Sequence, residues 1–176
     1  MLNLTKLINK IRMKRWLSDG LTVGSNFQLC RGASLDSSFP WLITIGDNVT
    51  MAADSYILAH DGSTKKIVGY SKLGKVKIGN NVFIGAKAIV LPGCSVGNDV
   101  VIAAGCIVNH DLPSNVVVAG TPAKVIQDIA TFYEKHHNLI NELPIFEKEY
   151  TNGGGISKDR KREMIEKLEH CNGYVV

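Results

Sequence analysis

One histidine stands where it could do chemistry. His60 ends the apolar stretch "MAADSYILAH" and opens a long polar loop. A neutral imidazole, with an unperturbed pKa near 6.5, can take a proton from a hydroxyl or an amine at physiological pH. Asp61 or a backbone carbonyl could hold the ring in one tautomer, and the residue types favour neither. Taken by itself, a histidine at the start of a loop is more often a solvated side chain.

Metal chemistry is not expected from the other candidate ligands. A catalytic zinc site of the histidine type needs three converging imidazoles, and the central region has only His60 and His110. The cysteines show no Cys-x-x-Cys pairing that would predict a zinc site or a disulfide framework. They are Cys30, Cys94, Cys106 and Cys171. Two of them, Cys94 and Cys106, lie in apolar runs, where buried thiols are expected.

A period of six residues organises the centre of the chain. Aliphatic side chains recur at Ile78, Ile84, Val90, Val96, Ile102 and Val108, and earlier at Val23, Leu29 and Leu35 and at Ile45, Met51 and Ile57. Such a period combines a short strand with a tight turn, and three repeats can make one triangular coil. Stacked coils bury the aliphatic residues and satisfy each other's backbone hydrogen bonds. The pattern therefore predicts a parallel β-helix, interrupted by loops at residues 36–41 and 60–77.

Helical patterns flank the repeats. Residues Leu2 to Leu17 predict an amphipathic helix whose apolar face should pack on the body or on a neighbouring subunit. That face consists of Leu4, Leu7, Ile8 and Ile11. After Ile126 the spacing becomes helical again, and a Gly-rich linker precedes a second charged helix. The expected domains are an N-terminal helix (1–20), a β-helix (21–126) and a C-terminal helical extension (127–176).

Composition limits the partners. The formal net charge is +4, from 20 basic and 16 acidic residues, which is too small an excess to indicate nucleic-acid binding. No apolar run of about 20 residues predicts a membrane span, and the N-terminus has no secretory pattern. We therefore expect a protein of the reducing cytoplasm without a membrane partner.

The segment "IGNNVFIGAKAIVLPGCSVGNDVVIAAGCIVNHDLPSNVVVAGTPAKVI" resembles the hexapeptide-repeat acyl-CoA acetyltransferases. It is most similar to their sugar and polysaccharide O-acetyltransferase branch, which includes galactoside and maltose acetyltransferases. The resemblance covers roughly Thr22 to Ile126. It implies an all-β fold with a left-handed coil, an exception to the usual right-handed crossover. It also implies a homotrimer with active sites between adjacent subunits, and acetyl-CoA as the co-substrate.

The resemblance assigns roles at the acceptor side. His60 would be the general base that deprotonates the acceptor hydroxyl, which attacks the thioester directly without an acyl-enzyme. Asp36 lies where related sugar acetyltransferases bind the acceptor with an acidic residue, although a turn aspartate fits the sequence equally well. Trp41 could stack on a sugar or cover the core. The lysine-rich loop 61–77 could be solvated, or could close over an anionic acceptor.

The same resemblance assigns contacts to acetyl-CoA. Ala86 and Ala104 would let the pantetheine arm approach the coil, and Asn109 occupies a further contact position. Lys124, in "AGTPAKVI", matches a basic position that meets the CoA phosphates.

Transfer of an acetyl group to a sugar hydroxyl is therefore the expected function. Acetylation of an amine acceptor, such as an amino sugar, an amino acid or an antibiotic, remains open within the same fold. A non-catalytic structural β-helix is the other alternative, and it predicts no affinity for CoA.

Overall fold

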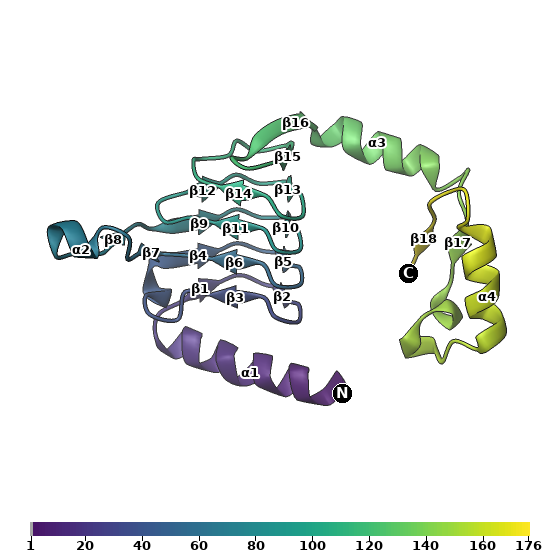
Figure 1. Cartoon of the computed structure of the whole chain (residues 1–176), viewed down its shortest axis with the longest axis horizontal. Coiled ribbons are helices and arrows are strands. Elements are labelled where there is room, and N and C mark those ends of the chain that lie inside the picture. Colours follow the sequence, from purple (N-terminus) through teal and green to yellow (C-terminus); the bar gives the residue numbers. More distant parts are fainter. Residues whose placement is uncertain (1) are drawn as a thin grey trace. The chain divides into compact units, whose positions relative to one another are not determined.

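The computed structural model describes residues 2–176, with side chains from residue 7 onward. The chain forms two compact units, the first ending at Ile129 and the second running from Ala130 to Val176. The first unit contains the N-terminal helix and a stack of coils, shown in purple to green in Figure 1.

The body of the first unit is a parallel β-helix with three sheets, and each complete coil gives one strand to each sheet. Sheet A contains β1 (Thr22–Val23), β4 (Ile43–Ile45), β9 (Val76–Ile78) and β12 (Ser95–Val96). Sheet B contains β2 (Gln28–Leu29), β5 (Thr50–Met51), β10 (Val82–Ile84), β13 (Val100–Ile102), β15 (Val116–Ala119) and the antiparallel β16 (Lys124–Asp128). Sheet C contains β3 (Ser34–Leu35), β6 (Tyr56–Ile57), β11 (Ile89–Val90) and β14 (Ile107–Val108).

The inward ladder predicted from the six-residue period is confirmed. Of its aliphatic residues, only Val23 and Leu29, both in the first coil, are partly exposed, and the rest form the buried core. Burial of each such side chain contributes about 1.5–3 kcal/mol. Cys94 and Cys106 are buried as expected, and so is Ala88.

The corners between sheets A and B carry a column of amide side chains. Asn26, Asn48, Asn81 and Asp99 all have φ values between 54° and 57°, a left-handed conformation that Asn and Asp tolerate better than most residues. Each amide group donates to the side chain of the next coil, at 2.9, 3.0 and 3.0 Å. These bonds lock successive coils in register at this corner.

Helix α1 (Leu2–Ser18) closes the first coil through its polar face. The Asn9 amide donates to the carbonyl of Leu29, at 2.8 Å, and the Arg12 guanidinium donates to the carbonyl of Ala33, at 3.1 Å. The same guanidinium lies 4.6 Å from the ring centre of Trp16, which is 3% exposed. Because β2 and β3 are edge strands, these side chains satisfy carbonyl groups that no further coil covers.

Of the two partners predicted for the apolar face of this helix, the body is not the one that it contacts, and packing on a neighbouring subunit stays a prediction. Leu7, Ile8 and Ile11 are exposed, while Met13 and Trp16 pack on the core. The side chain of Leu4 lies outside the described residues. The side of the helix that faces the coil carries the residues that hydrogen-bond to it, Asn9 and Arg12. The predicted apolar face is therefore turned away from the coil.

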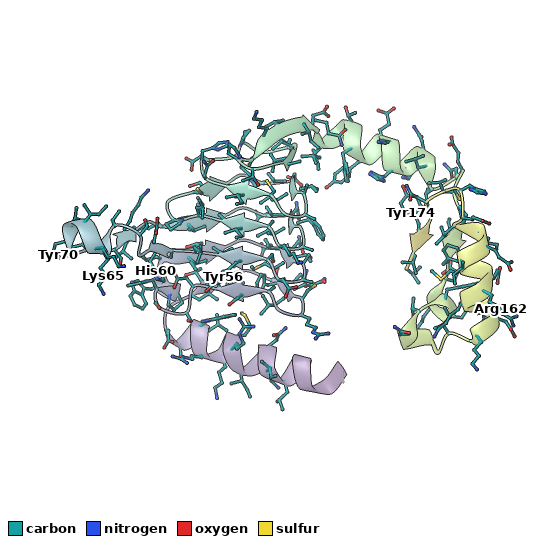
Figure 2. All side chains as sticks on the ribbon, viewed as in Figure 1. Tyr56, His60, Lys65, Tyr70, Arg162 and Tyr174 are labelled. Atoms are coloured by element: carbon teal, nitrogen blue, oxygen red, sulfur yellow. The ribbon has the colours of Figure 1, made fainter. Side chains whose placement is uncertain are left out.

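Both interruptions of the repeat lie where sheet C leads to sheet A. The first holds a 3-10 turn, η1 (Pro40–Leu42). The second is a hairpin rather than a plain loop, with β7 (His60–Asp61) antiparallel to β8 (Lys72–Leu73) and the short helix α2 (Lys65–Val68) between them. The hairpin projects from the coil stack, with His60 at its base and Lys65 and Tyr70 near its far end (Figure 2).

The second unit is small. It contains most of α3 (Ile129–Leu139), the parallel pair β17 (Ile145–Phe146) and β18 (Tyr174–Val175), the turns η2 (Lys148–Tyr150) and η3 (Asn152–Gly154), and α4 (Lys158–Lys167). Its buried centre is Phe146, whose ring lies 5.2 Å from that of Tyr150. No helix within residues 2–176 has both the length and the apolar character needed to cross a membrane.

The glycines of the A–B corner generate a stability prediction. A Cβ on Gly79 would lie 2.5 Å from the Gly97 carbonyl oxygen of the next coil, so the Gly79→Ala variant must shift backbone. We expect a loss of about 1–3 kcal/mol, or roughly 2–12 °C in Tm for a chain of this size. Differential scanning calorimetry at fixed protein concentration measures it. In the matched Gly62→Ala control the nearest atom is 3.8 Å away, and an equal loss in both variants would contradict the argument.

Candidate active site

Asp36 and His60 are brought together by the register of the coils. Leu35 of β3 pairs with Ile57 of β6, and the Asp36 backbone N–H donates to the Ile57 carbonyl at 2.8 Å. Asp36 comes directly after β3. In the next coil, the residues directly after β6 lead into the hairpin, so they lie beside Asp36. The imidazole Nδ1 of His60 lies 2.5 Å from Asp36 Oδ2.

The Asp36 carboxylate is buried but well satisfied. Its residue is 1% exposed, Oδ2 accepts from the backbone N–H groups of Ala59 and His60 at 3.0 Å each, and Oδ1 accepts from that of Ser38 at 3.0 Å. Burial raises the pKa of this carboxyl, but the hydrogen bonds from the His60 ring, Ala59 and Ser38 outweigh it, so the pKa lies below its ordinary value. Asp36 is therefore ionised at neutral pH.

This geometry settles which nitrogen of His60 is free. An ionised carboxylate can only accept, so Nδ1 carries the proton and donates to Asp36. In the neutral form of this ring, Nε2 then holds the lone pair. Among the described residues, no protein group is hydrogen-bonded to Nε2. The side chain is 35% exposed, so the imidazole is partly accessible from solvent.

The partner of the ring is neither of the two that the sequence suggested. The Asp61 carboxylate instead accepts from the backbone N–H of Ser63, at 2.8 Å, which lowers its pKa. Asp36, expected to contact the acceptor, has its oxygens occupied by the chain itself. The acceptor contact predicted for Asp36 stays a prediction; in the structure its buried carboxylate accepts four hydrogen bonds, one of them from His60.

A pocket of about 470 Å³ opens beside His60. Its apolar wall consists of Leu58, Leu91 and Pro92, which follow the strands of sheet C, and its polar rim includes Asn109 and Lys72. Polar and apolar residues contribute about equally to its lining, so the pocket can offer both packing and hydrogen bonds to a small molecule. Asn109, predicted to contact CoA, thus lies in the same pocket as His60.

The other predicted CoA contacts gather elsewhere on the coil. The Ala86 carbonyl accepts from the N–H of Gly105 at 2.8 Å, so Ala86 and Ala104 lie at one corner in successive coils. The turn that leads to the exposed Lys124 stacks next, because the N–H of Ile107 donates to the Gly120 carbonyl. This column precedes the strands of sheet C, whereas His60 and Asn109 follow them. Within one chain the two groups therefore lie at opposite ends of the strands of sheet C.

Phe39, Leu91 and Pro92 also lie near His60, although no motif in the sequence marks them. The Phe39 ring centre lies 5.1 Å from that of His60, and the other two residues line the pocket. A signal for the Asp36–His60 pair was present, because coils of known register place the residue after Leu35 beside the residues after Ile57. The sequence alone does not show that Ala59 keeps its place in the coil where the hairpin begins, and the pairing depends on that.

Among residues 2–176, no group of three or more His, Cys, Asp or Glu side chains is placed to hold a metal ion. Cys94 and Cys106 are buried in the core, where burial raises the pKa of both thiols.

Comparison with curated proteins reveals relatives along most of the chain. Protein CapG of Staphylococcus aureus is 40% identical over 144 residues, which cover 74% of this chain and 81% of CapG. The galactoside O-acetyltransferase of Escherichia coli is 40% identical over 94 residues, 51% of this chain and 45% of that enzyme. A 2,3,4,5-tetrahydropyridine-2,6-dicarboxylate N-acetyltransferase of Staphylococcus aureus is 34% identical over 100 residues, 57% of this chain and 39% of that enzyme.

Solved structures share the fold. The hexapeptide-repeat acetyltransferase VCA0836 of Vibrio cholerae, determined with acetyl-CoA, superposes with a TM-score of 0.56 at 22% identity, over 62% of this chain and 61% of that one. The family described as bacterial transferase hexapeptide (six repeats) matches residues 75–110. With the CapG relationship across the coils, these matches confirm the expected left-handed β-helix, and the chain belongs to the hexapeptide-repeat transferase family.

Proposed function

We propose that the chain transfers an acetyl group from acetyl-CoA to a hydroxyl of a sugar or polysaccharide precursor, with His60 as the general base. The observation that carries the proposal is the Asp36–His60 pair beside a pocket: in the neutral imidazole, the hydrogen bond to Asp36 leaves the lone pair on Nε2. The family relationship and the similarity to a galactoside O-acetyltransferase supply the reaction class.

The proposed reaction needs few groups from the protein. His60 Nε2 accepts the proton of the acceptor hydroxyl while the hydroxyl oxygen bonds to the thioester carbonyl carbon. The C–S bond then breaks, and the proton held by His60 passes to the departing sulfur. Asp36 stabilises the imidazolium that forms between these steps, as a buried carboxylate does beside other catalytic histidines. Direct attack needs no acyl-enzyme, because both substrates are held side by side.

The pocket suits the narrow end of acetyl-CoA. Leu58, Leu91 and Pro92 offer an apolar wall to the acetyl and pantetheine groups, and the Asn109 amide can bond to an amide of the arm. Lys124 would pair with phosphate as a compact cation. These assignments extend the sequence-based expectations for Asn109 and Lys124.

A homotrimer would join the two separated groups. Ala86, Ala104 and Lys124 precede the strands of sheet C, whereas His60 follows them, so the two groups lie at opposite ends of these strands in one chain. In a threefold arrangement of identical chains, each subunit contacts its neighbour through two different surfaces. The corner that precedes sheet C in one subunit can then face the corner that follows sheet C in the next. We propose that each active site takes His60 from one subunit and the Ala86–Ala104 column from the next.

Replacing the proposed base tests the chemistry. We expect His60→Ala to lower kcat by roughly 10²–10⁴-fold, because the general base is lost, while acetyl-CoA binding by calorimetry stays unchanged. CoA release is measured by a thiol assay with sugar hydroxyls and with amines as acceptors. The exposed His137→Ala serves as the control. Turnover with amines alone would replace the O-acetyl proposal by N-acetyl transfer, and wild-type turnover in the variant would overturn the role of His60.

Replacing Asp36 tests the positioning role. We expect Asp36→Asn to lower kcat by roughly 10²-fold or more, since the ring loses its fixed tautomer and its counter-charge. The KM values for both substrates should stay near those of the wild type. The ¹⁵N shifts of the imidazole should show the Nδ1–H tautomer in the wild type and a mixture in the variant. An unchanged tautomer with a lost kcat would mean that Asp36 acts in another way.

The same variant tests the acid dependence of stability. The folded-state pKa of Asp36 is lowered, so its ionised form stabilises the fold above the pKa of a free aspartate, about 3.9. That contribution is lost as the pH falls from there through the folded-state value. In urea titrations between pH 6 and pH 3, the wild type should lose more stability than Asp36→Asn. Parallel curves would show that Asp36 titrates as in the unfolded chain.

Mixing two inactive chains tests the shared site. His60→Ala removes the base, and Ala104→Trp should block the exposed corner where CoA is proposed to pass. In trimers assembled at random from equal amounts, about a quarter of the sites would combine one intact histidine with one intact corner. Co-expression should therefore restore up to about a quarter of the wild-type rate. No recovery, or full activity of Ala104→Trp alone, would contradict the shared site.

A further inference from the structure

A second pocket lies on the outer surface of sheet A, on the other side of the hairpin base. It has a volume of about 510 Å³, and its lining includes Trp41, Thr44, Lys75, Lys77 and Ser95. We call these five residues the sheet A groove. The mechanism proposed above uses none of them.

The floor of the groove is a row of outward polar side chains. Thr44 of β4, Lys77 of β9 and Ser95 of β12 are register partners, and all three are exposed. Adjacent strands therefore present a hydroxyl, an ammonium group and a second hydroxyl side by side. Such a row can bond to several oxygen atoms of one ligand.

An exposed tryptophan forms the wall. Trp41 is 57% exposed, an unusual state for so large an apolar side chain. Its backbone is held by close packing against Gly20, where an added Cβ would lie 2.9 Å from the Cβ of Trp41. The backbone of Trp41 therefore has a fixed place beside the pocket that its side chain lines. An exposed aromatic face of this kind packs against the C–H face of a pyranose ring, which is apolar.

The cations of the groove are unpaired. Lys75 and Lys77 are exposed, and among the side chains of residues 7–176 no carboxylate lies within ion-pair distance of either. Lys75 directly precedes β9 and Lys77 lies within it; because both line the same groove, their charges repel and a bound anion is favoured. A carboxylate would gain charge-assisted hydrogen bonds from both.

One aromatic ring connects this groove to the proposed base. The Phe39 ring centre lies 5.5 Å from that of Trp41 and 5.1 Å from that of His60. The Phe39 ring therefore lies next to both the tryptophan of the groove and the proposed base. An oligosaccharide is long enough to occupy the groove while its next sugar reaches Nε2.

We propose that the sheet A groove is an acceptor subsite that binds an acidic sugar unit, with Trp41 against the ring and Lys75 and Lys77 on its carboxylate. This inference rests on the proposed carbohydrate acceptor and narrows it to anionic oligosaccharides or polysaccharides. The unit held in the groove is not the one acetylated. It positions its neighbour in the chain at His60.

Calorimetry without acetyl-CoA tests the subsite separately from catalysis. The probes are tetragalacturonic acid and its fully methyl-esterified form, which has the same rings without the charge. We expect the acid to bind at least tenfold more tightly than the ester. Lys75→Gln/Lys77→Gln and Trp41→Ala should each lose tenfold or more, whereas Trp41→Phe and Lys75→Arg/Lys77→Arg should retain binding. Equal binding of acid and ester, or no binding of either, would overturn the proposal.

Matched variants separate the possible failures. Lys135→Gln/Lys148→Gln removes two exposed charges from the second unit and should leave binding unchanged. A general effect of net charge would weaken binding there too, and would overturn the subsite. His60→Ala should bind the acid like the wild type. If it does while no acceptor is acetylated by the wild type, the proposed function fails and the subsite stands.

Kinetics distinguish the acceptor from the nucleotide end of acetyl-CoA, whose phosphates are also anionic. With an acidic oligosaccharide as acceptor, Lys75→Gln/Lys77→Gln should raise the acceptor KM at least tenfold at unchanged kcat and unchanged KM for acetyl-CoA. A higher KM for acetyl-CoA with an unchanged acceptor KM would assign the groove to the CoA phosphates and overturn the proposal.

Discussion

Backbone hydrogen bonds between successive coils place every side chain of the proposed site. Each strand of two or three residues is too short to be stable alone, so its N–H and C=O groups depend on the coils on either side. The aliphatic ladder inside and the amide column at the corner hold the same register. Once that register exists, residues about one coil apart in sequence are neighbours in space. The meeting of Asp36 and His60 is a direct consequence.

The buried carboxylate is the costly element of this arrangement. Removing Asp36 from water disfavours its ionised form, and only the surrounding hydrogen bonds reverse the effect on its pKa. Two of the donors, the N–H groups of Ala59 and His60, become available because the chain turns out of β6 into the hairpin there. The turn that creates the loop therefore also stabilises the charge that orients the histidine.

The coil localises variation at one corner. Passages from sheet A to B and from B to C are short turns in every complete coil, whereas two passages from C to A carry insertions. Those insertions supply η1 with Trp41 and the hairpin with its lysines, next to His60 and Phe39. A uniform stack thus acquires a specific surface without disturbing its core. His60, the Phe39 and Trp41 rings and the sheet A groove are neighbours because they share this corner.

The amino-acid sequence by itself determined the coil, its inward residues, the positions of both insertions and the candidate histidine. Those features follow from local periodicity, since each repeat must bury one aliphatic residue and turn after it. Only the tertiary structure decided that Asp36 rather than Asp61 holds the imidazole, and that α1 contacts the coil through Asn9 and Arg12 rather than through its leucines. It also decided that Trp41, Lys75 and Lys77 share a groove. These outcomes depend on contacts between different coils and insertions. Residue type and spacing do not distinguish Asp36 from Asp61 as the partner of His60. The hydrogen-bond geometry between coils does.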